Sequence, residues 1–399
     1  FYQYISIPLN NCLRRIFSRF SGRIKAIPKL SVYLTGGNIR MLRKLGYYYK
    51  NQAFYYRVSN ISDPKHLNCI GKQAKAVEFS GPLKRNNIVD SIKSYMSTKA
   101  PNLKSLKINL HDTELLEMRL LGVGFGRGNV KQITSNLNLL RVIGSSRLEQ
   151  LGLSFSGFSM DYPKQTMQYF FKKLRYLTRL STLELKFPTP ITGLKQGVSS
   201  LINKLPNIKN LALCGLQKSN NQRFFGVQGD NIQEEEPHLE ELIMEEKLKN
   251  IQLELAGMLD GQLFHRVKTY LSKRNDLTTF GLTVRNMIEG EFWDGYPKYN
   301  LEKPILAQKN LRNFKFGYKS YPPYTDLNPS QILKNKDLYS FNYSIPVDED
   351  IATTNYHHGG GVYHDSPKTC IDLAGVLKQH KNLTKLTLNW QGVRYLQAE

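Results

Sequence analysis

Apolar residues recur along this chain in one short pattern. In LKSLKINL, which begins at Leu103, large apolar residues stand at relative positions 1, 4, 6 and 8. Positions 4, 6 and 8 alternate, so their side chains point to one face of a short β-strand. Position 1 stands three residues earlier, where the chain turns into that strand. Altered copies follow as LEQLGLSF from Leu148, LSTLELKF from Leu180, IKNLALCG from Ile208, LEELIM from Leu239, LTTFGLTV from Leu277, LRNFKFGY from Leu311, LYSFNYSI from Leu338 and LTKLTLNW from Leu383.

Helical segments precede several of these strands. Before the Leu103 copy, Ile88, Ile92 and Met96 fit one face of a helix, and Pro101 marks the turn into the strand. LKQGVSSLINK followed by Leu205-Pro206, and DLAGVLKQ before the last copy, repeat the same order. One helix–turn–strand unit cannot bury its apolar face alone, so the units are expected to stack into an α/β solenoid with one strand per repeat.

The L-x-x-L-x-L spacing of these nine segments resembles the leucine-rich repeat, in its irregular, helix-containing form similar to the ribonuclease-inhibitor class. Cys214 in the Ile208 copy matches the asparagine or cysteine that the family places after its strand. The resemblance implies a horseshoe with a parallel β-sheet on the concave face and helices on the convex face. A weak first copy begins at Ala74, so we divide the chain into a basic, aromatic N-terminal extension over 1–69 and a leucine-rich-repeat domain over 70–399.

The spacing between copies predicts long insertions. First positions are 27 residues apart from Leu311 to Leu338 but 45 apart from Leu338 to Leu383, whereas regular units span about 20–29 residues. The extra length is assigned to loops at 122–128, 217–236, 286–304 and 348–367, and such loops tend to gather at one edge, where partners bind. LKNIQLEL from Leu248 also fits the pattern, so the strand of that repeat lies either there or in LEELIM.

Charge and composition narrow the classes of partner. The chain carries 56 Lys and Arg against 32 Asp and Glu, a net charge of +24. This excess favours RNA, an anionic membrane surface or acidic protein faces, or else reflects a compartment of generally basic proteins. The four cysteines are far apart, which argues against a disulfide framework or zinc site. No run of about 18 apolar residues occurs, so we expect no transmembrane segment.

The first 62 residues contain no Asp or Glu and carry eleven Lys or Arg. Leu13, Phe17 and neighbouring apolar residues follow helical spacing, with Arg14, Arg15 and Arg19 mostly elsewhere. This Arg-rich amphipathic stretch resembles a mitochondrial targeting segment. The alternatives are a membrane-surface helix or a basic arm packed on a neighbouring subunit. The chain begins at Phe1 rather than Met, so a processed product or a fragment is expected.

Two clusters of aromatic residues are candidate interface anchors. Tyr47, Tyr48 and Tyr49 stand in LGYYYKNQAFYYR, where tyrosines beside basic residues suit either base stacking or a protein interface. The alternative is a strand or arm packed on the first repeat. Phe292, Trp293 and Tyr296 stand in a predicted insertion and either anchor a partner or fold back to cap the core. With Arg14, Arg15 and Arg19, these are the interface candidates.

No motif gives a convincing catalytic, cofactor or metal site. GVGFGRGN at 122–129 matches neither of the phosphate-binding spacings GxxxxGK(S/T) and GxGxxG. HHGGGVYHD at 357–365 offers histidines on a glycine-rich loop, but no G-x-S-x-G nucleophile elbow accompanies it. The acidic run around 234–246 either docks a basic partner or lies on a solvated repeat face. We therefore expect no catalytic residues, no cofactor, no metal and no small-molecule substrate, and hence no enzyme.

These expectations lead to a non-catalytic protein-interaction scaffold. It is expected to be an accessory structural subunit of a large mitochondrial assembly, in the matrix or on the matrix side of the inner membrane. A respiratory-chain or ATP-synthase complex is favoured slightly over a ribosome. The longest uninterrupted Lys/Arg run is two residues, whereas extensions that penetrate RNA often have blocks of five or more. Partners would be other protein subunits, with anionic lipid or rRNA as further options. The alternatives are a mitochondrial ribosome-associated RNA-binding subunit and a cytosolic substrate adaptor of a ubiquitin ligase.

Overall fold

The structure is a computed structural model of the 399-residue chain. The described residues fall into two compact units, Phe1–Ile208 and Lys209–Glu399. None of the described helices is long and apolar enough to cross a membrane. The structure describes residues 31–35, 55–59, 67–68, 70–80, 92, 94–97, 102–111, 147–156, 164–190, 194–216, 239–257, 261–286, 301–318, 329–345, 378 and 380–390.

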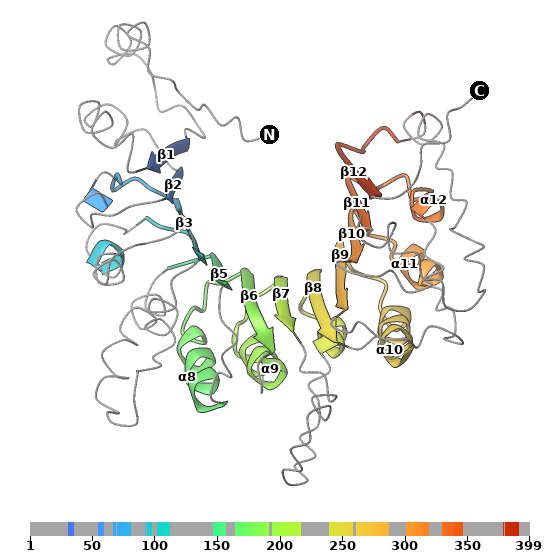
Figure 1. Ribbon diagram of the computed structural model, residues 1–399, viewed down its shortest axis with the longest axis horizontal. Coiled ribbons are helices and arrows are strands. Elements are labelled where there is room, and N and C mark those ends of the chain that lie inside the picture. The colour runs from blue at the N-terminus through green and yellow to red at the C-terminus, as the bar shows by residue number, and fades with distance from the viewer. Residues whose placement is uncertain are drawn as a thin grey trace, which may run out of the picture. The chain divides into compact units, whose positions relative to one another are not determined.

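Unit 1 is a parallel β-sheet with helices packed against one face (Figure 1). Neighbouring strands pair in chain order, which requires the chain to cross back between them; from β5 to β6 this crossover contains the helix α8. The strands are β1 (Ser31–Thr35), β2 (Tyr55–Ser59), β3 (Ala76–Ser80), β4 (Ser105–His111), β5 (Gln150–Ser156) and β6 (Thr182–Pro190), and the helices are α8 (Lys164–Leu174) and α9 (Leu194–Lys204).

Unit 2 repeats this arrangement (Figure 1). Its strands also pair in parallel and in chain order. The elements are β7 (Asn210–Leu216), the 3-10 helix η3 (Leu239–Met244), β8 (Asn250–Gly257), α10 (Gly261–Ser272), β9 (Thr279–Asn286), α11 (Glu302–Leu306), β10 (Asn313–Tyr318), α12 (Pro329–Ile332), β11 (Ser340–Ile345) and β12 (Lys385–Trp390). Each unit is therefore a solenoid-like α/β arrangement in which successive strands extend one parallel sheet.

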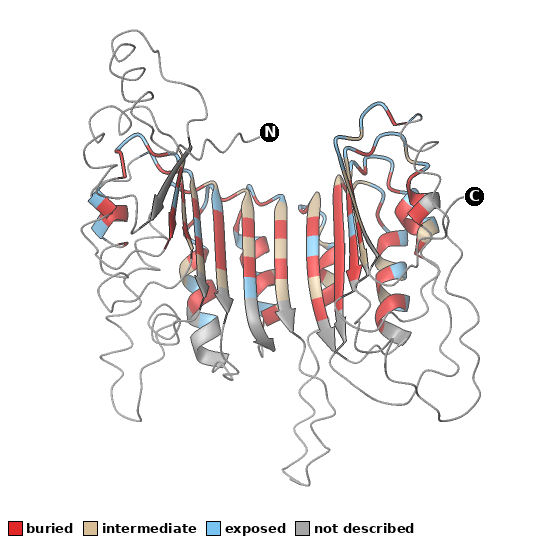
Figure 2. Cartoon of the chain, turned by 45° about the horizontal axis from the view of Figure 1, so that its top comes forward, coloured by how far each residue is buried: buried red, intermediate tan, exposed pale blue. Residues whose placement is uncertain are grey.

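The sheet register explains why the apolar pattern recurs. Position-4 residues of neighbouring strands are directly paired, as in Leu106 with Leu151 and Phe280 with Phe314. These residues are all buried beneath the helices (Figure 2). In unit 2, aromatic residues replace leucine at several of these places, and Phe314 and Phe341 stack with ring centroids 5.6 Å apart. The core is therefore a continuous row of apolar side chains shared between neighbouring repeats.

The sequence leaves the strand of this repeat open between LEELIM and LKNIQLEL, and the structure has it in LKNIQLEL. Leu239–Met244 forms η3, and the strand is β8, which begins at Asn250 in the alternative segment LKNIQLEL. Leu242 and Ile243 are adjacent and both buried, which a helical turn permits but an alternating strand does not. Leu248 takes position 1 of this repeat.

The sheet also begins earlier than the first repeat copy at Ala74. Strands β1 and β2 lie within residues 1–69 and pair in parallel with each other, and β2 pairs with β3. Tyr56 and Val58 alternate with Arg57 and are buried, so β2 follows the same alternation as the later strands.

Gly197 on α9 generates a prediction, because its missing side chain admits the ring of Phe171 on α8. A Cβ atom at this position would lie 2.1 Å from Cδ2 of that ring. Replacing a helical glycine by alanine ordinarily stabilises a helix by about 1 kcal/mol. We expect Gly197→Ala to lower the free energy of unfolding instead, by about 1–3 kcal/mol, as measured by chemical denaturation.

Ser200→Ala, at an exposed position of the same helix, is the matched control and should change stability by less than about 0.5 kcal/mol. Adding Phe171→Leu should recover part of the loss in Gly197→Ala. A stabilised Gly197→Ala protein would contradict the close packing of α8 on α9.

Candidate functional site

Each strand presents alternate side chains on the face opposite the helices, which we call the polar face (Figure 2). On β4, Leu106 and Ile108 are buried, whereas Lys107 between them is exposed. The parallel register places such outward residues of neighbouring strands side by side. The described polar face of unit 2 consists of Asn210, Ala212, Cys214, Asn250, Gln252, Glu254, Thr279, Gly281, Thr283, Asn313, Lys315, Gly317, Ser340, Asn342, Ser344, Lys385 and Thr387.

The polar face of unit 1 is a row of paired charges. Arg57 Nη2 lies 3.1 Å from Glu78 Oε1 on the neighbouring strand. Lys107 Nζ lies 2.6 Å from Glu184 Oε2, although β5 separates their strands. Gly152 on β5 makes this reach possible, because a Cβ there would lie 3.0 Å from Cγ of Lys107. Charges on this face are thus largely neutralised by one another.

Despite partial burial, the neighbouring lysines lower the pKa of the Glu184 carboxyl group. Partial burial raises the pKa of its carboxyl group, but hydrogen bonds and positive charge from Lys107 and Lys186 outweigh burial and hold the pKa below its ordinary value. The ionised form is therefore favoured in the folded chain, and Glu184 is held as a structural counter-ion.

The polar face of unit 2 is mostly uncharged. Its described members include three charged residues, Glu254, Lys315 and Lys385. Asn250 Nδ2 donates to Asn210 Oδ1, and Asn313 Nδ2 donates to Thr279 Oγ1 over 3.1 Å. The result is a surface of amides, hydroxyls and glycines rather than a charged groove.

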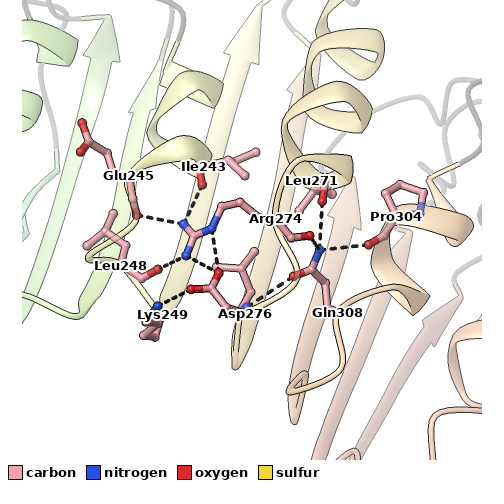
Figure 3. Close-up of polar contacts among 10 residues, drawn as sticks. Ile243, Glu245, Leu248, Lys249, Leu271, Arg274, Asp276, Pro304 and Gln308 are labelled. Carbon is pink, nitrogen blue, oxygen red and sulfur yellow. Dashed lines mark hydrogen bonds and ion pairs between the residues drawn. The ribbon is translucent and has the colours of Figure 1, made fainter.

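A buried arginine ties the repeats of unit 2 together from inside (Figure 3). Arg274 lies in the connection between α10 and β9, and its side chain is 5% exposed. Its Nη1 donates to the carbonyl oxygens of Ile243 (2.7 Å) and Glu245 (2.9 Å) in the preceding repeat. Its Nη2 donates to the carbonyl of Leu248 and to Asp276 Oδ1, both at 2.7 Å. The guanidinium thus donates to carbonyls at the helix end and turn, of which the Glu245 carbonyl also accepts the backbone N–H of Leu248.

Gln308 fills the same place one repeat later (Figure 3). It is 1% exposed, and its Nε2 donates to the carbonyls of Leu271 (3.0 Å), Arg274 (2.6 Å) and Pro304 (3.1 Å). Its Oε1 accepts the backbone N–H of Leu277 over 3.4 Å. Both atoms of the amide are therefore used inside the core.

Two further polar residues continue this series. Asn335 Nδ2 donates to the carbonyl of Leu311 over 3.2 Å, and His380 Nε2 donates to the carbonyl of Leu333. Each of the four residues stands three positions before the first leucine of its repeat, so we call them the carbonyl ladder: Arg274, Gln308, Asn335 and His380. In the described part of unit 1, two of the equivalent positions are buried leucines, Leu177 and Leu205.

The acidic run does not form a uniformly solvated face. Glu240 is fully buried, and its Oε1 accepts a 2.5 Å hydrogen bond from Nε of Arg266 on α10. Glu246, later in the described part of the run, is exposed. Glu240 therefore joins η3 to α10 and is not accessible to a partner.

The predicted interface residues lie outside the described residues: Arg14, Arg15, Arg19, Tyr47, Tyr48, Tyr49, Phe292, Trp293 and Tyr296. So do the glycine-rich stretch 122–129 and the histidine-containing stretch 357–365. Within the described part of the chain, no group of three or more His, Cys, Asp or Glu could hold a metal ion. Sequence reasoning missed the carbonyl ladder, although the polar residue three positions before each leucine is visible in unit 2.

Glu184→Gln tests the charge row of unit 1. The pKa of Glu184 is lowered by folding, so its contribution is present above the ordinary pKa of 4.5 and is lost as the pH falls through the folded value. We expect the variant to be less stable by about 0.5–1 kcal/mol at pH 7, with the difference from the unchanged protein shrinking below pH 4.5. Urea unfolding across pH measures it. Glu246→Gln is the exposed control, and a pH-independent difference would contradict the account.

Arg274→Met tests the carbonyl ladder. The variant removes the side-chain donor from three backbone carbonyls and a partner from Asp276, so we expect a loss of about 3–5 kcal/mol in unfolding free energy. Lys273→Met, at the exposed neighbouring position, should cost less than about 0.5 kcal/mol. Equal stabilities of the two variants in chemical denaturation would show that the ladder does not hold unit 2 together.

No protein-family model and no curated protein matches this chain in sequence.

Proposed function

We propose that this protein is a non-catalytic interaction scaffold of the leucine-rich-repeat type, in its helix-containing, ribonuclease-inhibitor-like form. The sheet would line the concave side of a horseshoe and the helices its convex side. The observation that carries the proposal is the polar face: successive strands present side chains in register, one short row per repeat. Such a face offers an extended surface for a protein partner, with each repeat contributing a few contacts.

The chemistry of the polar face favours a protein partner over a nucleic acid. Nucleic-acid binding draws most of its affinity from Lys and Arg that neutralise phosphates. In unit 2 the described face is mainly amide and hydroxyl, and in unit 1 its cations are paired with glutamates. Asn342 Oδ1 is a buried acceptor with no hydrogen-bond donor among the described residues. A polar protein surface could complement these groups.

We further propose that the scaffold is an accessory subunit of a large mitochondrial assembly on the matrix side of the inner membrane, in a respiratory-chain or ATP-synthase complex. The acid-free, Arg-rich first 62 residues and the net charge of +24 support this placement. The same net charge supports the alternative, a subunit associated with rRNA in the mitochondrial ribosome.

Affinity capture of the full chain from native organelles tests the scaffold. A polar-face variant combines Gln252→Arg with Lys315→Glu, two exposed positions on β8 and β10 that both lie in register with Gly281 on β9. Its control combines Gln331→Arg with Lys268→Glu on helices of the same unit, so that the change in charge is identical. We expect the polar-face variant to lose its partner proteins at least tenfold, since a reversed charge in a docked surface is strongly unfavourable, while the control keeps them. Circular dichroism should show both variants folded.

Three outcomes would contradict parts of the proposal. Loss of partners from both variants, or from neither, would show that the polar face is not the docking surface. Release of the protein from its assembly by ribonuclease would favour the ribosomal alternative. Absence of the protein from purified mitochondria would overturn the mitochondrial placement.

A further inference from the structure

The two edges of the sheet in unit 2 differ in the length of the chain attached to them. At the edge where strands begin, the helix-to-strand connections are short, with six residues from α10 to β9 and six from α11 to β10. The segments that follow the strands vary more in length, from three residues between β8 and α10 to 22 between β7 and η3. Figure 2 shows exposed residues along the short connections. Because these connections are short, the side chains on them lie close together along this edge.

Basic side chains gather on the part of this edge formed by β10, β11 and β12. Lys309, Lys336 and Lys381 occupy one equivalent place, two residues before the first leucine of three successive repeats, and all are exposed. Their strands are neighbours, about 4.8 Å apart in such sheets. We call this surface the basic edge, which comprises Lys309, Arg312, Lys334, Lys336 and Lys381 together with the exposed apolar residues Leu306 and Tyr339.

Charge is not compensated locally on the basic edge. Among the described residues of these connections, Asp337 is acidic against the five cations. The neighbouring connections toward β8 and β9 are different, because Lys249 is paired with Asp276 there. Cations near helix ends interact favourably with the helix dipole, but α11 and α12 have only five and four residues. Their dipoles give little reason for five exposed cations.

Apolar side chains stand within this positive surface. Leu306, the last residue of α11, is 41% exposed, and Tyr339 is 39% exposed. The guanidinium of Arg312 lies 5.5 Å from the centroid of the Tyr339 ring. An aliphatic side chain gains free energy only by leaving water, and tyrosine suits a boundary where its ring is apolar and its hydroxyl is wet. Lysines around them can bury their stems and keep their ammonium groups at a polar layer.

This combination fits an anionic lipid surface better than RNA. RNA-binding surfaces rely on aromatic faces that stack on bases; Leu306 provides no such face, and Arg312 already lies over the ring of Tyr339. Basic residues flanking exposed Leu and aromatic side chains are the composition of interfacial membrane contacts. We propose that the basic edge docks unit 2 on an anionic membrane surface, with the lysines at lipid phosphates and with Leu306 and Tyr339 entering the interfacial layer.

The inference deepens the proposed placement at the inner membrane but needs no protein partner. The test uses the purified full chain with phosphatidylcholine vesicles, with and without cardiolipin or phosphatidylserine, in a co-sedimentation assay. The unchanged chain should bind anionic vesicles and not neutral ones, and binding should weaken as salt is raised. Each basic residue near such a surface contributes roughly fivefold in partitioning. Lys309→Glu, Lys336→Glu and Lys381→Glu together should therefore weaken binding by at least about 100-fold.

The matched control changes three exposed lysines of the same unit that lie off the basic edge, Lys268→Glu, Lys303→Glu and Lys315→Glu, and should weaken binding less than about tenfold through long-range charge alone. Leu306→Ser with Tyr339→Ser, which keeps every cation, should weaken binding at high salt most. Circular dichroism and thermal unfolding confirm that each variant is folded.

Equal losses in the two triple variants would overturn the basic edge and leave only non-specific attraction. Competition by inorganic phosphate beyond that of chloride at equal ionic strength would point to a free phosphate site instead of a lipid surface. Tighter binding to single-stranded RNA than to anionic vesicles, lost in the basic-edge variant, would identify the edge as an RNA surface. If vesicle binding follows the prediction while partner capture fails, the docking inference stands and the polar-face scaffold falls.

Discussion

The repeats of unit 2 depend on satisfying the backbone carbonyls at the turns between helix and strand. A buried carbonyl without a donor costs free energy comparable to a lost hydrogen bond. Arg274 and Gln308 answer this by placing side-chain donors inside the core, each reaching into the preceding repeat. Because each of these two donors has acceptors in the preceding repeat, the repeats are joined by hydrogen bonds as well as by shared apolar packing. Two described repeats of unit 1 instead have the buried leucines Leu177 and Leu205 at the equivalent position.

Local spacing explains which parts of the fold could be predicted. The copy at Leu103 and its later relatives place strands correctly from β4 to β7 and from β9 to β12, because alternation of side chains is a property of a few consecutive residues. LEELIM fits the strand pattern but forms η3, because its leucine spacing suits both a short strand and a helical turn. The Lys107–Glu184 pair joins residues 77 positions apart and needs a glycine between them. No local pattern contains that information.

The interface predictions rest on a different kind of reasoning. Arg14 and Trp293 are interface candidates because of the residue types around them and because they stand in an N-terminal extension and a predicted insertion. Both stay predictions. The surfaces that the structure does describe are the polar face and the basic edge, and they separate two kinds of recognition. The polar face is mostly uncharged in unit 2 and has paired charges in unit 1, and it offers hydrogen bonds. The basic edge carries uncompensated charge beside exposed apolar side chains. A scaffold held between a membrane and a protein complex would use both.

The central claim is that the polar face, and not the helices, contacts the protein partner. Lysine labelling of the protein inside its native assembly tests this claim most directly. Lys315 on the polar face and Lys268 on α10 are both exposed in the chain by itself. Their rates of acylation, read by mass spectrometry, should be similar in the purified chain. In the assembly, the account predicts strong protection of Lys315 and little change at Lys268. Protection of Lys268 with Lys315 still reactive would mean that the helices, and not the polar face, meet the partner.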